Sequence, residues 1–243
     1  MKRAIFEALQ SARTAKRAVV VATALEDGRQ ALIDGDRAEG DLALAETIRA
    51  AARRALRDDK SRMIETDAGP VFMQAFNTPL RMFVVGAVHI AQALAPIAVI
   101  AGYAVTLIDP RRSFATAARF PGVTLTHDWP DEAMDRLKLD ARTAVVTLTH
   151  DPKIDDPALE RALRSDCFYI GCLGSTRTHK ARLARLAGQG FGDKDFARLH
   201  GPIGLDIGAQ SPAEIAISIV AEVTAVLRGE PAAAAAATAT AAA

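Results

Sequence analysis

Residues 81–111 read RMFVVGAVHIAQALAPIAVIAGYAVTLIDPR, and this stretch decides the fold. Met82–Val85 is a short apolar run rich in β-branched residues, which predicts a buried strand. Gly86 predicts a tight turn, residues 89–101 an apolar helix and residues 103–108 a second buried strand. A strand, a glycine turn, a helix and a strand that ends in an acid form the opening unit of a dinucleotide-binding fold.

The glycine fingerprint of this unit is altered at one position. Its usual order is Gly-x-Gly-x-x-Gly/Ala, whereas residues 86–91 read GAVHIA. The second glycine lets the backbone approach a pyrophosphate, and Val88 places a branched side chain there. The pattern therefore predicts the fold but disfavours NAD as a ligand.

The composition of the 243-residue chain excludes several classes of protein. Half of the residues are hydrophobic and 24% are charged, as in globular proteins. A formal net charge of +1 gives no electrostatic reason to expect nucleic acid or an anionic membrane as a partner. No apolar run reaches membrane-spanning length, and the basic N-terminus lacks the apolar core of a signal peptide. Two cysteines, Cys167 and Cys172, make no disulfide framework, which indicates a cytoplasmic protein.

Residues 1–79 predict a small α+β N-terminal domain. After a first helix, two hairpins are expected, over residues 18–33 and 62–76. Between the hairpins, Asp41 can cap a helix that runs to about Leu56. Asn77-Thr78-Pro79 reads as the linker to the next domain.

Residues 80–230 continue the alternation of strands and helices, which calls for a parallel sheet covered on both faces. Beyond residue 111, strands are predicted over residues 123–126, 144–148 and 167–170, and helices over 131–137, 157–164, 176–186 and, weakly, 191–199. Ser211-Pro212-Ala213-Glu214 is a capping box that begins the last helix. The predicted fold class is α/β, a Rossmann-like doubly wound parallel sheet behind the small N-terminal domain. Residues 231–243, Ala and Thr after a proline, are predicted to be disordered.

Ligands of open parallel sheets bind beyond the carboxyl ends of the strands, and polar residues follow each predicted strand there. Histidines stand just past three strands, which favours His89 and His150, and less strongly His127, as pocket-lining residues. The candidate contacts from these loops are Gly86, His89, Asp109, Arg111, His150 and Asp151. No His-x-x-x-His or Cys-x-x-Cys spacing predicts a metal site.

The sequence GCLGSTRTHK at residues 171–180 carries the sharpest local signal for a ligand. Ser175 or Thr176 caps a helix whose first turn has free backbone donors, a favourable dipole and basic side chains. This pattern favours phosphate binding over a capped surface helix. The candidate contacts are Gly174, Ser175, Thr176, Arg177 and His179, with Asp206 added from the glycine-rich loop at 201–208.

Five segments resemble the XdhC/CoxI family of accessory proteins for xanthine dehydrogenase and carbon monoxide dehydrogenase. They are VVGAVHIAQALAPIA, TLIDPR, VTLTHDPKIDDPAL, YIGCLGSTRTHKARLARL and GPIGLDIGAQSPAEIAISIVAEV, and they cover most of residues 81–228. The resemblance implies a maturation factor that binds the molybdenum cofactor (molybdopterin) and assists its sulfuration and insertion into the target enzyme. It implies a molybdoenzyme and a cysteine desulfurase-type sulfurase as partners, and it leaves a homodimer open.

The chain departs from the family pattern at two places. The family's first turn usually reads Gly-Ala-Gly-His, and Val88 replaces its second glycine. The family's N-terminal domain usually carries Gly-Gly-Cys-Val-Glu, whereas the region around Asp34–Glu46 has no cysteine. We expect a cofactor-binding chaperone without turnover of its own. Two alternatives stay open: an NAD(P)-dependent oxidoreductase that uses the same cleft, and a cofactor-free scaffold that bridges a sulfurase and the molybdoenzyme.

Overall fold

The computed structural model describes residues 1–229, and the predicted disordered segment at 231–243 lies outside them. The chain divides into two compact units, Met1–Thr78 and a second that begins at Pro79. Each unit has its own sheet and its own buried clusters of apolar side chains.

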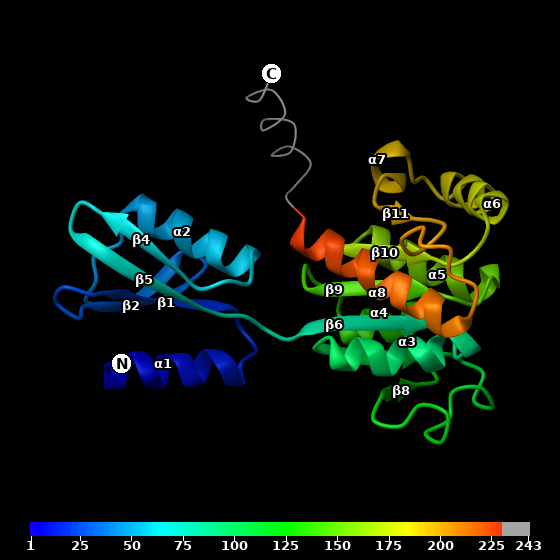
Figure 1. The fold of residues 1–243 in the computed structure, drawn as a ribbon, viewed down its shortest axis with the longest axis horizontal. Helices are drawn as coiled ribbons and strands as arrows, with labels where there is room; N and C mark the ends of the chain where they lie inside the picture. Colours follow the sequence, from blue (N-terminus) through cyan, green and yellow to red (C-terminus); the bar gives the residue numbers. More distant parts are fainter. Residues whose placement is uncertain (230–243) are drawn as a thin grey trace. The chain divides into compact units, whose positions relative to one another are not determined.

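The first unit is a five-stranded antiparallel sheet between two helices (Figure 1). The strand order is β3-β2-β1-β5-β4. Alternate residues of the central strand face opposite ways, so Val21 packs with α1 and Val20 packs with α2. The elements are α1 (Arg3–Thr14), β1 (Val19–Ala24), β2 (Gln30–Asp34), β3 (Arg37–Gly40), α2 (Glu46–Arg57), β4 (Arg62–Thr66) and β5 (Gly69–Phe76).

One expectation for this unit is wrong, and one strand was not expected. Helix α2 begins at Glu46 rather than after Asp41, and a short strand, β3, precedes it. The Asp41 carboxylate instead accepts the backbone N–H of Gln30 at 2.9 Å and pairs with the Lys2 ammonium group. Asp41 thus holds the start of β2 instead of capping a helix.

The second unit is a six-stranded parallel sheet in the order β11-β10-β9-β6-β7-β8, which confirms the predicted Rossmann-like fold. Helices α3 and α8 cover one face of the sheet, where they pack with Met82 and Val84 of β6. Helices α4, α5 and α6 cover the other face, where they pack with Phe83 and Val85. Figure 1 shows α8 running beside α3, and the two helices contact each other along their length. The elements are β6 (Leu80–Val85), α3 (His89–Ile100), β7 (Tyr103–Ile108), β8 (Thr124–Thr126), α4 (Pro130–Leu137), β9 (Thr143–Thr147), α5 (Pro152–Leu163), β10 (Tyr169–Cys172), α6 (Thr176–Ala187), α7 (Asp193–Phe196), β11 (Leu199–His200) and α8 (Pro212–Arg228).

The strand order reverses between β6 and β9. From β6 the chain proceeds through β7 to β8 in one direction, and from β9 it proceeds through β10 to β11 in the other. The first crossover helix, α3, lies on one face, and α5, which follows β9, lies on the opposite face. Two adjacent strands therefore send their connections apart, and this topological switch point is where such folds bind ligands.

Several element boundaries of this unit differ from the expectation, most of them by one or two residues. Helix α5 begins at Pro152 rather than at Pro157, because the Asp151 side chain caps it by accepting the N–H of Lys153 at 3.0 Å. Strand β10 begins at Tyr169, two residues later than predicted. The weak helix expected over 191–199 is only the four residues of α7, followed by the two-residue strand β11.

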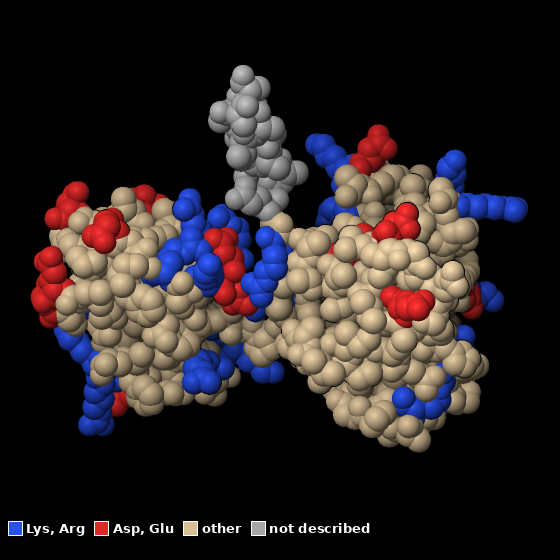
Figure 2. Space-filling view, in the orientation of Figure 1, with Lys and Arg blue, Asp and Glu red and all other residues tan. Residues whose placement is uncertain are grey.

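The surface of each unit carries both signs of charge. On the face drawn in Figure 2, blue Lys and Arg side chains lie beside red Asp and Glu side chains, and much of the second unit carries neither. Among residues 1–229, no helix combines the length and the apolar character that are needed to cross a membrane.

We predict that a fragment of residues 80–230 folds by itself, because its sheet, helices and two apolar clusters come from that segment alone. The expected result is a single cooperative thermal transition, measured by circular dichroism. A fragment that starts at residue 87 and lacks the central strand β6 is the control and should not fold. An aggregated or unfolded 80–230 fragment would contradict the prediction.

Candidate functional site

The loops that follow β6 and β9 touch each other at the switch point. Gly86 has φ +107°, a conformation that favours glycine. A β-carbon added there would lie 2.4 Å from Cγ2 of Thr149 and 3.4 Å from its backbone nitrogen. The absence of a side chain at Gly86 thus allows the two central loops to approach closely.

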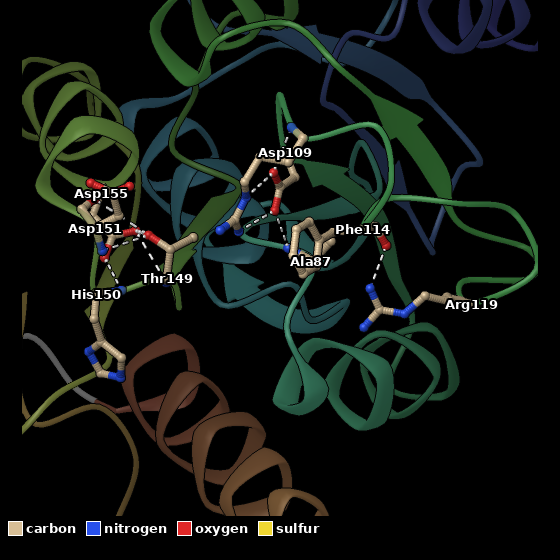
Figure 3. A network of polar contacts seen from close by, with 9 residues as sticks. Ala87, Asp109, Phe114, Arg119, Thr149, His150, Asp151 and Asp155 are labelled. Carbon is tan, nitrogen blue, oxygen red and sulfur yellow. Dashed lines mark hydrogen bonds and ion pairs between the residues drawn. The ribbon is translucent and has the colours of Figure 1, made fainter.

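Asp109, at the end of β7, fixes the loop after β6 (Figure 3). Its side chain is fully buried, and Oδ2 accepts the N–H of Ala87 at 2.7 Å. Arg111 donates from its backbone N–H and Nε to Oδ1, both at 2.9 Å, and from Nη2 to Oδ2 at 2.8 Å. The Arg111 guanidinium also lies over the ring of Phe114, 4.7 Å from its centre. Both carboxylate oxygens are therefore used inside the protein.

The surroundings of Asp109 favour its charged form. Burial alone would raise the pKa of Asp109, but the hydrogen bonds from Arg111 and from the Ala87 N–H outweigh burial and lower that pKa. An acid at this position of a dinucleotide-binding fold usually accepts a ribose hydroxyl. Here Asp109 has no exposed oxygen for that purpose, so its role is to hold the glycine turn.

The start of α3 presents one polar candidate and one apolar residue. Val88 is the residue before the helix, and its half-buried side chain packs against the cluster under α3 and α8. His89, the first helical residue, is exposed. Within residues 1–229, the N-cap residue Val88 makes no side-chain capping bond, so the first N–H groups of this helix lack the usual side-chain acceptor.

The loop after β9 is organised by Asp155, a residue that the sequence analysis did not select. Asp155 lies in the first turn of α5 and is 2% exposed. Its carboxylate accepts the Thr149 hydroxyl at 2.7 Å, the Thr149 N–H at 3.3 Å and the His150 N–H at 3.0 Å. His150 itself is exposed and has φ +61°. Only the spacing of Asp155 four residues after the helix cap Asp151 could have indicated this role.

The start of α6 has the capped geometry that the sequence predicts. Ser175 accepts the N–H of Thr178 at 3.2 Å, and Gly174 precedes it with φ +136°. Thr176 and Arg177 are exposed in the first turn. A β-carbon added to Gly174 would lie 3.4 Å from Nδ1 of His150, so the His150 ring lies beside this loop. The structure thus brings together the candidates that follow β9 and β10.

A buried arginine from the same helix, Arg182, lies beneath this loop. It is 2% exposed, and its Nη2 donates to the carbonyl oxygen of Leu173 at 2.8 Å. Its Nε has no hydrogen-bond partner, and Arg182 makes no ion pair within the described residues. A guanidinium is always charged, so positive potential is fixed directly under the start of α6. The sequence does not single out Arg182, because nothing in its position on the predicted helix distinguishes a buried arginine from a surface arginine.

His179 has a packing role that differs from its predicted one. Its ring lies against Gly201, where a β-carbon would come within 2.2 Å of Nδ1. Burial and then the positive charge of Arg182 lower the pKa of His179 below its usual value of 6.5, so the ring is neutral at pH 7. His179 therefore contributes shape rather than charge to the site.

The loop after β11 is held against the sheet by Glu222 of α8. The Glu222 carboxylate accepts the Tyr169 hydroxyl at 2.5 Å and the Gly204 N–H at 2.8 Å. The Ile203 N–H donates to the carbonyl oxygen of Cys172 at 3.2 Å. Asp206 lies exposed further along this loop, and within residues 1–229 no polar contact joins it to the other candidates.

The Rossmann-like unit matches a known family of domains. The family model described as the XdhC Rossmann domain matches residues 82–223, more than half of the chain. The chain belongs to the XdhC family.

Similar proteins with curated names come from two bacteria. A molybdenum cofactor insertion chaperone, PaoD of Escherichia coli, is 30% identical over 155 residues, which are 64% of this chain and 42% of PaoD. A protein of Bacillus subtilis named as a probable subunit of xanthine dehydrogenase is 29% identical over 154 residues, 63% of this chain and 44% of that protein. An uncharacterized E. coli protein, YqeB, is 31% identical over 163 residues, 66% of this chain and 30% of YqeB. The chain thus matches less than half the length of each relative.

A solved structure shares the fold of this XdhC-family chain. It is a crystal structure described as a xanthine dehydrogenase from Bacillus halodurans, with a TM-score of 0.72 and 23% sequence identity. The match covers 93% of this chain and 67% of the other.

The thiols of this XdhC-family chain are not exposed to a ligand. Cys167 and Cys172 are buried. Burial raises the pKa of Cys172 to about 12 and also raises the pKa of Cys167, so both are protonated at neutral pH. Within residues 1–229, no group of three or more His, Cys, Asp or Glu side chains is arranged to hold a metal ion.

We predict that Asp109→Asn destabilises the protein by about 2–3 kcal/mol at pH 7, because it weakens buried hydrogen bonds to a charged group. The folded-state pKa of Asp109 is lower than its ordinary value of 3.8, so its stabilising effect is present above that value and is lost as pH falls through the lowered pKa. Thermal unfolding from pH 7 to pH 3 should show the two proteins converging at acid pH. A stability difference that stays constant over this range would contradict the assignment.

Proposed function

We propose that the chain is a cytoplasmic maturation factor that binds the molybdenum cofactor as cargo and assists its sulfuration and insertion into a xanthine dehydrogenase-type molybdoenzyme. The observation that carries the proposal is the 30% identity over 155 residues to a protein named as a molybdenum cofactor insertion chaperone, together with the family match over residues 82–223. The partners are that molybdoenzyme and a cysteine desulfurase-type sulfurase. The chain itself performs no turnover.

The start of α6 suits the phosphate end of the cofactor. The exposed first turn offers the N–H groups of Thr176 and Arg177, while Ser175 satisfies only the N–H of Thr178. The Arg177 side chain is a forked donor that matches phosphate oxygens. Buried Arg182 adds a second positive charge behind the backbone donors. Three separate features of one helix start therefore favour the same anion.

The buried thiols bear on how sulfur would reach the cofactor. A persulfide carrier requires an accessible thiolate, and both cysteines of the chain are buried with raised pKa values. We infer that the sulfurase delivers sulfur directly to the cargo while this chain holds it. The chain's contribution is then binding and orientation, with the cofactor left exposed at the sheet edge for its partners.

The engagement of Asp109 argues against an NAD(P)-dependent oxidoreductase. Both of its oxygens accept hydrogen bonds from Ala87 and Arg111, so neither is free for a ribose hydroxyl. Val88 also stands where the fingerprint has its second glycine. A cofactor-free scaffold would have no use for the positive charge at the start of α6.

Arg177→Ala should weaken binding of the molybdenum cofactor by about 10- to 100-fold, because a hydrogen bond to a charged group contributes roughly 1.5–3 kcal/mol. Titration of the purified protein with cofactor released from a molybdoenzyme under anaerobic conditions, followed by pterin fluorescence, measures the change. NADH serves as the comparison ligand and should give no saturable signal at micromolar concentration.

Lys194→Ala is the charge-matched control for this experiment. Lys194 is exposed on α7, outside the candidate site, and its removal should change affinity by less than about 2-fold. Arg185 is unsuitable as a control, because it pairs with buried Asp156 at 2.6 and 2.9 Å. Equal losses for Arg177→Ala and Lys194→Ala would show general electrostatics, and no loss for Arg177→Ala would remove the α6 start from the binding site.

A further inference from the structure

His150 has a left-handed backbone conformation that helix termination does not explain. Within residues 1–229, the other non-glycine residues with positive φ are Lys16, Asp59 and Lys138, and each lies one or two residues after the last residue of a helix. Left-handed residues are common there because they close the last turn. His150 instead lies between β9 and α5. The conformation costs a non-glycine residue roughly 1–2 kcal/mol, so its neighbours must impose it.

The neighbour that imposes this conformation is Asp155. One carboxylate oxygen accepts the His150 N–H at 3.0 Å, and the other accepts the Thr149 hydroxyl and N–H at 2.7 and 3.3 Å. Figure 3 shows these bonds converging on Asp155 while the His150 ring points away from them. Three bonds to two consecutive residues leave the loop little freedom.

The protein retains a carboxylate at this position although burial disfavours its charge. Burial raises the pKa of Asp155, and the hydrogen bonds from Thr149 and the positive charge of Arg182 oppose that effect only in part. A raised folded-state pKa means that stability is lost as pH rises from the ordinary value of 3.8 through the raised pKa. An amide of the same shape would avoid the cost, but its NH2 group would replace one of the two acceptor oxygens and would face either the His150 N–H or the two Thr149 donors. The arrangement is therefore built around loop geometry rather than around stability.

The imposed geometry brings the His150 ring to the loop before α6. Nδ1 of His150 lies 3.4 Å from the position of a β-carbon on Gly174, the residue before the helix cap. Arg182, 98% buried with an unpartnered Nε, lies beneath the same loop and independently indicates an anion there. An imidazole beside this loop adds a donor from a second element.

We propose that Asp155 is a positioning residue that holds His150 in the left-handed conformation, so that the His150 imidazole contacts the phosphate group of a ligand bound at the start of α6. The proposal rests on the proposed function for the phosphate site, and it adds the group that connects the β9 loop to that site. Asp155 acts through His150 and does not touch the ligand. His150 is the direct contact.

A double-mutant cycle on the full-length chain tests this inference, with inorganic pyrophosphate as the probe and titration calorimetry as the measurement. His150→Ala and Asp155→Asn should each reduce affinity about 10-fold, as expected for one hydrogen bond to a charged group. The double variant should lose no more than either single variant, because Asp155 acts through the ring that His150→Ala removes. The amide hydrogen of residue 150 should also exchange faster in Asp155→Asn.

Glu160→Gln is the matched control. Glu160 is a half-buried acid of the same helix, α5, and within residues 1–229 its carboxylate makes no hydrogen bond or ion pair with the loop, so its replacement should change pyrophosphate affinity by less than about 2-fold. Thermal unfolding of each variant shows that the chain is folded. If His150→Ala does not fold, His150→Gly replaces it, because glycine removes the ring and relieves the backbone strain together. If Asp155→Asn does not fold, Asp155→Glu replaces it, because it keeps the charge but moves the carboxylate, and it should reduce affinity in the same way.

The outcomes separate this inference from the proposed function. Additive losses in the cycle, an unchanged affinity in Asp155→Asn, or no pyrophosphate binding by the wild-type chain would each overturn the positioning role. Those results concern the loop and leave molybdenum cofactor content as a separate measurement. A wild-type chain that completes the cycle as expected but never carries molybdenum or pterin would overturn the proposed function alone.

Discussion

The close approach of two loops at the switch point is the constraint on which the second unit depends. Gly86 and Thr149 meet where a β-carbon would be only 2.4 Å from a methyl group. From this contact the chain leaves β6 toward the face of α3 and leaves β9 toward the face of α5. The two loops diverge because their helices lie on opposite faces of the sheet. The groups proposed to hold a ligand lie at the edge of the sheet where the loops diverge.

Two buried carboxylates fix the two loops, and their electrostatic situations are opposite. Asp109 is neutralised by a bidentate arginine and has a lowered pKa, so it stabilises the fold while it closes the glycine turn. Within residues 1–229, Asp155 has no bonded cation; it has a raised pKa and is hydrogen-bonded to a histidine in a left-handed conformation. A protein retains the second arrangement, which costs stability, where the geometry serves a ligand.

Local chemistry explains which parts of the fold could be predicted from the sequence. The strand, glycine turn and helix at 82–100 and the capping box at Ser211 depend on near neighbours, and the structure contains them. The start of α5 was misplaced because both Pro152 and Pro157 suit a first helical turn, and only the bond from Lys153 to Asp151 decides between them. Strand β11 consists of two residues whose identity as a strand comes from pairing with β10.

The candidate site was predictable to a smaller extent, for the same physical reason. The capped start of α6 follows from Ser175 and its neighbours, whereas the burial of Arg182 depends on how α6 packs on the sheet. The engagement of Asp109 by Arg111 and Ala87 depends on a contact between residues 22 positions apart in the chain. Because of such contacts, Asp109, which the sequence suggests as a ligand residue, has a structural role. Arg182, which the sequence does not single out, supplies positive charge beneath the site.

The most direct test of the account is the molybdenum and pterin content of the full-length wild-type chain after production together with the cofactor biosynthesis machinery. Elemental analysis gives molybdenum, and fluorescence of the oxidised pterin gives the organic part. The account predicts that both copurify with the protein in near-equal amounts, at levels approaching the protein concentration. A folded, monodisperse protein that carries neither molybdenum nor pterin would contradict it.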